Sequence, residues 1–154
     1  MLTTPRSHRR WFVLVPLVAA LALPASTLAA TIIGGPGNDV LYGTTSADTI
    51  YGNGGNDLVY GRAGNDTIYG GADGDRLHGG YGNDWIYGGY GGDGISGGPG
   101  SDHLSGGYGD DSIHAAGDGT GDAIKCGPGI DHVVYGPTDT FADSSCEHTS
   151  LRAY

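Results

Sequence analysis

Aliphatic side chains recur at every ninth position through the middle of the chain. They are Leu41, Ile50, Val59, Ile68, Leu77, Ile86, Ile95, Leu104 and Ile113. One apolar residue in nine does not produce the continuous apolar stripe of an amphipathic helix. In a strand, successive side chains point to opposite faces. The pattern therefore predicts short strands of three residues, each with one inward side chain and two outward neighbours.

The residues between these aliphatic positions repeat with the same period of nine. Every unit has Gly at position 1, Asp at position 6 and Leu, Ile or Val at position 8. Glycine permits positive φ angles, and Asn at position 5 tolerates the left-handed region, so each unit is predicted to be a tight six-residue turn followed by a strand. The units are GGPGNDVLY (34–42), GTTSADTIY (43–51), GNGGNDLVY (52–60), GRAGNDTIY (61–69), GGADGDRLH (70–78), GGYGNDWIY (79–87), GGYGGDGIS (88–96), GGPGSDHLS (97–105) and GGYGDDSIH (106–114).

These units resemble the RTX, or haemolysin-type calcium-binding, nonapeptide repeat family. The resemblance covers 34–114 fully and 115–133 weakly. It implies an all-β fold, a parallel β-roll in which two units complete one circuit, with about five rungs here. It also implies that several Ca²⁺ ions bind to the carboxylates at position 6. Those residues are Asp39, Asp48, Asp57, Asp66, Asp75, Asp84, Asp93, Asp102 and Asp111, with Asp122 in a decayed unit.

A cation is expected at these aspartates on physical grounds as well. Units two apart lie on one side of a roll, about 4.8 Å from one another, so their carboxylates repel without a counter-ion. Two stacks are predicted, one from Asp39 to Asp111 and one from Asp48 to Asp102 or Asp122. Calcium accepts six to eight oxygen ligands in flexible geometry, whereas magnesium keeps its waters and zinc prefers nitrogen or sulfur. The alternative is a set of acidic, solvated turns.

Two units depart from the pattern in ways that bear on these sites. The unit 43–51 lacks Gly at positions 2 and 4, so the contribution of Asp48 is expected to be weak. The unit 70–78 carries Asp73 at position 4, which either adds a ligand or disrupts the turn.

Charge and glycine content narrow the class of protein. The chain has 32 glycines, the first at residue 34, which argues against an enzyme with a thick core. Residues 31–154 carry four basic and 17 acidic side chains, a net charge of −13. Such a surface repels nucleic acid and anionic lipid and attracts cations.

The first 30 residues are typical of a secretory signal peptide. Arg6, Arg9 and Arg10 precede an apolar run from Trp11 to Leu23, and a small-residue segment ends at Ala30. We therefore expect a secreted, extracellular protein that is free of the membrane after cleavage. An uncleaved anchor helix is the alternative, because 11–30 is just long enough to span a bilayer.

The chain has two cysteines, both near its C-terminus. In an oxidising compartment Cys126 and Cys146 are predicted to form a disulfide, with a free pair or a shared metal as alternatives. The predicted organisation is a signal peptide (1–30), a calcium-binding roll (31–133) and a disulfide-bearing cap (134–154).

Other motifs add little catalytic chemistry. Ser96 lies in a Gly-x-Ser-x-Gly sequence, but the hydrolase motif needs a strand-to-helix turn in a large sheet. We expect no enzyme, with a hydrolase as a remote alternative. The outward Tyr and Thr residues of the strands either support stacking or bind a glycan, such as one on a cell surface, or ice. The predicted function is calcium binding coupled to folding, in an extracellular structural or adhesive module.

Overall fold

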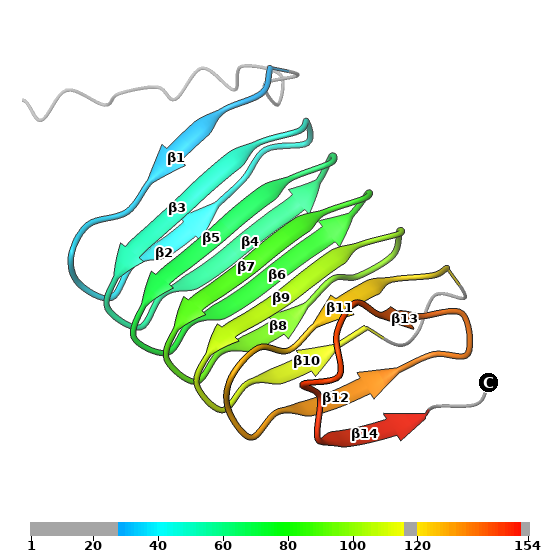
Figure 1. The fold of residues 1–154 in the computed structure, drawn as a ribbon. Coiled ribbons are helices and arrows are strands. Elements are labelled where there is room, and N and C mark those ends of the chain that lie inside the picture. The colour runs from blue at the N-terminus through cyan, green and yellow to red at the C-terminus, as the bar shows by residue number, and fades with distance from the viewer. Residues whose placement is uncertain (1–27, 116–119, 152–154) are drawn as a thin grey trace, which may run out of the picture.

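The computed structural model describes residues 28–115 and 120–151, which wind into a parallel β-solenoid with two sheets facing each other (Figure 1). One sheet consists of β1 (Thr31–Ile33), β3 (Thr49–Gly54), β5 (Thr67–Ala72), β7 (Trp85–Tyr90), β9 (His103–Tyr108), β11 (Ala123–Lys125) and β13 (Thr140–Phe141). The other consists of β2 (Val40–Tyr42), β4 (Leu58–Ala63), β6 (Arg76–Tyr81), β8 (Gly94–Ser96), β10 (Ser112–His114), β12 (His132–Tyr135) and β14 (His148–Leu151).

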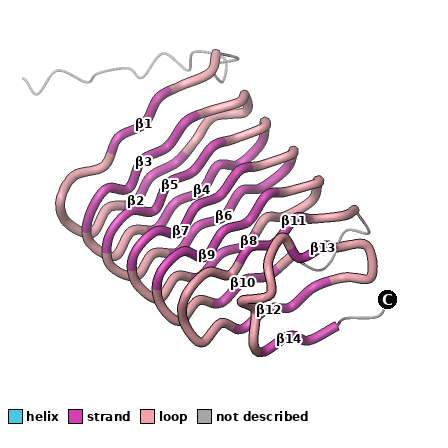
Figure 2. Tube along the Cα trace, in the orientation of Figure 1, coloured by secondary structure: helices cyan, strands magenta, loops and turns pink. Residues whose placement is uncertain are grey.

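The chain alternates between the two sheets, so each pair of repeat units completes one circuit. Ile50 lies beside Ile68, and Val59 beside Leu77, in parallel register. The predicted β-roll is confirmed, and the chain makes about six turns. The roll extends beyond the nine regular units because β11 to β14 continue both sheets. The described residues form strands and loops without a helix (Figure 2), and none of them offers a helical span for a membrane.

The core between the sheets is a double column of single aliphatic side chains. Ile50, Val59, Ile68, Leu77 and Ile86 are fully buried, as are their counterparts further along the roll. The residues on either side of them in each strand point outward. This confirms that position 8 is the one inward side chain of each unit. Ile32 and Leu41, at the N-terminal end of the roll, are only partly buried against this core.

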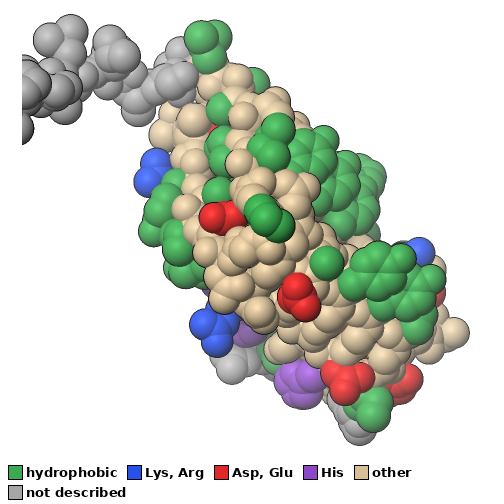
Figure 3. All heavy atoms as spheres, turned by 90° about the vertical axis from the view of Figure 1, so that its left-hand side faces the viewer, with side chains coloured by type: hydrophobic (Ala, Val, Ile, Leu, Met, Phe, Trp, Pro, Cys, Tyr) green, Lys and Arg blue, Asp and Glu red, His purple; other side chains and the backbone are tan. Residues whose placement is uncertain are grey.

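Several turns can be made only with glycine. Gly82 has a φ of 126°, and a side chain there would collide with the carbonyl oxygen of Gly64 on the preceding rung. Asp73, which replaces glycine at the equivalent position of its unit, adopts a φ of 73°. Its side chain accepts a hydrogen bond from the Gly55 N–H at 3.3 Å, so the turn is preserved. Figure 3 shows hydrophobic side chains along the flanks of the roll, whereas backbone and side chains that are neither hydrophobic nor charged cover much of the face between them.

The C-terminal segment packs against the last rungs of the roll. Phe141 of β13 lies beside Ile124 of β11, and its ring meets Tyr135 edge-on at 5.0 Å between centroids. Cys126 and Cys146 form the predicted disulfide, with 5.3 Å between their Cα atoms. The predicted signal peptide lies almost entirely outside the described residues, and the domain boundaries at 30 and 133 stay predictions.

Candidate metal centres in the turns

Each strand of the regular roll is preceded by an aspartate that is withdrawn from solvent. Asp66, Asp84 and Asp131 are fully buried, and the others in the interior of the roll are at most 3% exposed. Aspartate is almost never fully buried unless it is paired. The buried set is Asp48, Asp57, Asp66, Asp75, Asp84, Asp93, Asp102, Asp111, Asp122 and Asp131, whereas Asp39 at the end of the roll is half-buried.

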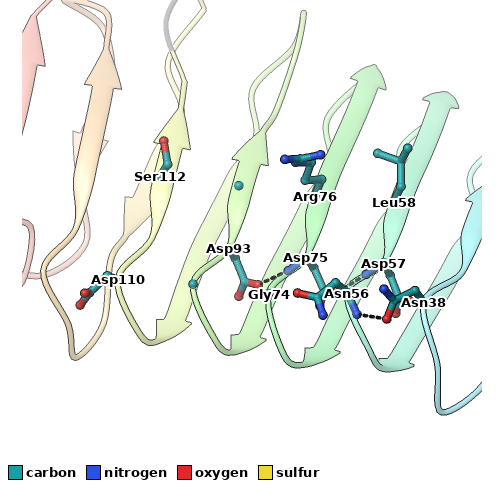
Figure 4. A pocket seen from close by; sticks show the side chains of 12 residues that line it. Asn38, Asn56, Asp57, Leu58, Gly74, Asp75, Arg76, Asp93, Asp110 and Ser112 are labelled. Carbon is teal, nitrogen blue, oxygen red and sulfur yellow. Dashed lines mark hydrogen bonds between the residues drawn. The ribbon is translucent and has the colours of Figure 1, made fainter.

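Backbone hydrogen bonds align these carboxylates in two columns. The Asp57 N–H donates to Oδ1 of Asp75, and the Asp75 N–H donates to Oδ1 of Asp93, both at 2.8 Å (Figure 4). The same bond links Asp66 to Asp84 in the other column. The columns have the membership that the sequence predicts, from Asp39 to Asp111 and from Asp48 to Asp122. The hydrogen bond satisfies one carboxylate oxygen of each interior aspartate.

The second carboxylate oxygen is the unusual feature of the columns. Within the described residues, Oδ2 is buried and has no hydrogen-bond partner in Asp57, Asp66, Asp75, Asp84, Asp93, Asp111 and Asp131. A buried polar atom without a partner destabilises a fold by about 1–3 kcal/mol, and by more when it carries charge. A regular series of such atoms indicates a shared ligand rather than isolated defects.

Carbonyl oxygens converge on the same places. A Cβ atom built on Gly61 would lie 2.5 Å from Oδ2 of Asp66 and 2.5 Å from the carbonyl oxygen of Gly79, one rung further on. At Gly34 the equivalent oxygens belong to Asp39 and Gly52, at 2.9 and 2.6 Å. The glycine at position 1 therefore leaves a small space between a carboxylate and a carbonyl oxygen. Hard oxygen donors of this kind fit Ca²⁺, which binds oxygen at about 2.3–2.6 Å.

The donor set limits how such an ion could be held. Across 28–115 and 120–151, no three His, Cys, Asp or Glu side chains cluster around one point. Turn carbonyls such as that of Gly79, which lie beside the carboxylates, are therefore further candidate ligands. This composition disfavours zinc, which prefers nitrogen and sulfur.

The electrostatics of the columns also favour a cation. Burial, reinforced by the neighbouring carboxylates, raises the pKa of Asp66 and of Asp75 to about 6. The same causes raise the pKa of Asp111 to about 7. Burial raises the pKa of Asp84 and Asp93 as well, although the N–H of the preceding aspartate works in the opposite direction. A positive ion between the rungs would oppose these shifts, because a nearby opposite charge favours the ionised carboxylate.

The N-terminal end of the roll differs from its interior. Oδ2 of Asp48 accepts a hydrogen bond from the Thr44 N–H at 2.5 Å, and Oδ1 accepts one from Ala30 at 2.6 Å. Both oxygens of Asp48 are therefore engaged by N–H groups, unlike those of interior residues such as Asp66, whose Oδ2 has no hydrogen-bond partner. Oδ2 of Asp39 likewise accepts the Gly35 N–H at 2.5 Å.

The columns continue past the predicted ligands at the C-terminal end. The Asp111 N–H donates to Asp131 at 2.9 Å, and the Asp122 N–H donates to Asp139 at 3.0 Å. Glu147 follows Asp131, accepting its N–H at 3.2 Å. The segment Cys-Gly-Pro-Gly-Ile-Asp, which ends at Asp131, keeps enough of the turn pattern to signal this residue. Asp139 and Glu147 lack such a signal.

Comparison with known proteins agrees with this geometry. No curated protein sequence matches the chain. The family model described as RTX calcium-binding nonapeptide repeat, in four copies, matches residues 33–68, 69–104 and 87–119. The matched region covers more than half of the chain, and its repeats contain the aspartate columns described above. The chain therefore belongs to the RTX calcium-binding nonapeptide repeat family.

Proposed function

We propose that this protein is a secreted, non-catalytic module that Ca²⁺ folds and holds rigid outside the cell. The observation that carries the proposal is the series of buried Oδ2 atoms, repeated on rung after rung without a hydrogen-bond partner. A chain with one core side chain per nine residues has little apolar burial to offset the entropy of ordering its backbone. The remaining stabilisation is assigned to metal binding, which for an unformed site is also folding free energy.

Each residue of a turn has a defined part in this scheme. Asp66 and Asp84 supply carboxylate oxygen from successive rungs of one column, and the glycine at position 1 leaves room beside them. A backbone carbonyl oxygen of the next rung, such as that of Gly79, lies across this space from the carboxylate and is a further candidate ligand. A Ca²⁺ ion held by these oxygens would supply the positive charge that the buried carboxylates lack. The proposed ligands are Asp39, Asp48, Asp57, Asp66, Asp75, Asp84, Asp93, Asp102, Asp111 and Asp122, joined by Asp131.

Export is supported by two features of the chain. The first 30 residues contain basic, apolar and small-residue segments in the order that is typical of a secretory signal peptide. The Cys126–Cys146 disulfide fits an oxidising compartment. Extracellular calcium lies in the millimolar range that modules of this kind use, with dissociation constants of about 10⁻⁴–10⁻³ M. The chain would thus remain unfolded before export and fold on meeting calcium outside.

A structural or adhesive role fits the site better than catalysis. Ser96, the one residue in a hydrolase-like sequence motif, ends β8, and the next described element is the strand β9. The strand-to-helix turn that exposes a hydrolase nucleophile is thus missing around this serine.

A calorimetric titration of residues 31–154 with Ca²⁺ and, separately, with Mg²⁺ tests the metal assignment. We expect several Ca²⁺ ions per chain, bound cooperatively, and weak heat from Mg²⁺, which dehydrates reluctantly. Equal binding of both ions, or fewer than two Ca²⁺ ions per chain, contradicts the proposal.

A further inference from the structure

Two columns of stacked rings run along the outer face of the sheet that contains β7. Tyr51, Tyr69 and Tyr87 stack at 5.0 and 5.1 Å between ring centroids. Beside them, Trp85 stacks on His103 at 3.9 Å. Both columns are nearly planar stacks, with interplanar angles of 5–8°.

Both columns stop at neighbouring rungs. The residue beside Tyr87 on the next rung is Ser105, and the residue beside His103 is Ala123. Neither carries a ring. Tyr87 and His103 therefore each have one ring face stacked on a neighbour and the other face directed along the roll axis, over a small side chain.

A hollow of about 360 Å³ lies at this step. Its lining combines the rings of Trp85, Tyr87 and His103 with the small residues Ser105 and Ala123. Ala142, which follows β13, closes the far side, where its N–H donates to the Ile124 carbonyl at 2.7 Å. Ligand sites commonly combine apolar walls with a few convergent polar groups, in volumes from about 300 Å³ upward.

The polar groups of the hollow are few and of defined chemistry. Lys125 lies next to Ser105 in register and is the single Lys or Arg among the described residues that line the hollow. The order across three rungs is thus a tyrosine ring, a serine and a lysine. Adjacent strands are about 4.8 Å apart, so the space over Ser105 is one ring thick and has a cation on its far side.

We propose that this hollow binds an acidic sugar, a uronic-acid residue of an extracellular glycan, in the place of the ring missing over Ser105. The C–H face of the sugar stacks on Tyr87, its carboxylate meets the ammonium group of Lys125, and its hydroxyls reach Ser105 and the imidazole of His103. The ammonium group of Lys125 favours an anionic ligand, and the Ser105 hydroxyl and His103 imidazole beside a ring-sized space favour a sugar over a purely apolar ring. Each bound Ca²⁺ would offset two of the 13 net negative charges, and Lys125 is the one Lys, Arg, Asp or Glu among the described residues that line the hollow.

The inference goes beyond calcium binding and rests on the proposed function only in requiring a folded roll. The test is a calorimetric titration of calcium-loaded residues 31–154 with three probes. These are a glucuronate-containing tetrasaccharide, a neutral tetrasaccharide of the same linkages, and benzoate as an aromatic carboxylate. Circular dichroism in the same calcium buffer shows whether the roll is folded, so a failure of folding is distinguished from a failure of binding. Calcium is kept in large excess over the probes, so that any Ca²⁺ that the acidic probes bind does not remove it from the protein.

Three variants locate the site. Ser105→Tyr, which extends the tyrosine column into the hollow, is expected to abolish binding without unfolding the roll. Lys125→Gln is expected to weaken binding of the acidic probe about tenfold and leave the neutral probe unaffected, because a charge-assisted contact is lost. Tyr51→Ala, at the other end of the same column, is the matched control and should bind like the parent.

Each result has a defined meaning. Preferential binding of the acidic tetrasaccharide that Ser105→Tyr removes and Tyr51→Ala retains supports the proposal. No binding by a folded roll, equal or tighter binding of the neutral tetrasaccharide or of benzoate, or full binding by Ser105→Tyr overturns it.

Discussion

Replacement of one interior carboxylate is expected to change the stability of the roll in opposite directions with and without calcium. Asp84 lies between Asp66 and Asp102 in its column, so it contributes to the spaces above and below it. Asp84→Asn retains the size of the side chain and an acceptor for the Asp66 N–H, but it removes the charge and the buried Oδ2.

The magnitude follows from the number of ions that the residue serves. An ion at 100 times its dissociation constant stabilises the folded state by about 2.7 kcal/mol. Loss of two ions therefore costs about 5 kcal/mol in 10 mM calcium, if each binds at about 10⁻⁴ M. That value is comparable with the whole stability of a small domain. In chelator the same substitution removes a buried charge without a counter-ion, so it should favour the fold.

Thermal melting, monitored by circular dichroism, measures the stability of the variant both in calcium and in chelator. The calcium arm uses 10 mM Ca²⁺, and the chelator arm uses added trimethylamine oxide, which favours compact states and populates the roll without metal. Asp110→Asn is the matched control, because Asp110 is exposed and its carboxylate accepts the Ile130 N–H at 2.8 Å, which asparagine can also do. If Asp84→Asn and Asp110→Asn melt alike in calcium, the column does not bind the ions.

Further expectations concern the ends of the roll, protons and the disulfide. Asp39→Ala should remove at most one ion by calorimetry, because Asp39 ends its column; a loss as large as that from an interior position contradicts the stacked arrangement. Burial raises the folded-state pKa of Asp111 to about 7, above its unfolded value of 3.8. Protonated Asp111 therefore favours the metal-free fold in acid, and this contribution to the free energy of unfolding is lost as the pH rises from about 4 through 7. In calcium the sign reverses, since protons compete with the ion, and the calcium midpoint measured at pH 5.5 should exceed that at pH 7.5. Truncation after His114 should leave ion binding by the early rungs but produce oligomers in light scattering, because the last strand edges are uncovered; a truncated chain as monomeric as the parent shows that the tail is no cap. Reduction of Cys126–Cys146 should destabilise the loaded roll by about 3 kcal/mol, visible as a lower melting temperature, whereas an unchanged melt assigns the disulfide no part in stability.

The period of nine was sufficient to predict the interior of the roll. Because two units make one circuit, residues 18 apart become neighbours, and the aspartate columns follow from arithmetic as far as Asp102 and Asp111. The next steps, to Asp122 and Asp131, span 20 residues. Ile68 and its equivalents are the only large apolar residues whose position is the same in all units, so the core could be identified as well.

The ends of the roll depended on tertiary contacts that the repeat does not encode. Asp139 and Glu147 extend the columns from segments whose spacing has no repeat, and β14 joins its sheet from the segment predicted as cap. At the other end, Thr44 provides the N–H that engages Asp48, a role that only the folded turn reveals. The pairing of Tyr87 with Ser105 follows from the separation of 18, whereas that of His103 with Ala123 spans 20 residues and is set by the structure.

The central claim is that calcium is part of the fold. Far-ultraviolet circular dichroism of residues 31–154 in excess chelator, followed by stepwise addition of Ca²⁺ to 10 mM, tests it most directly. The account predicts a largely disordered chain in chelator and a cooperative gain of β-structure, with a midpoint at about 10⁻⁴–10⁻³ M. A chain that is equally rich in β-structure in chelator, and that melts at the same temperature with and without calcium, contradicts the account.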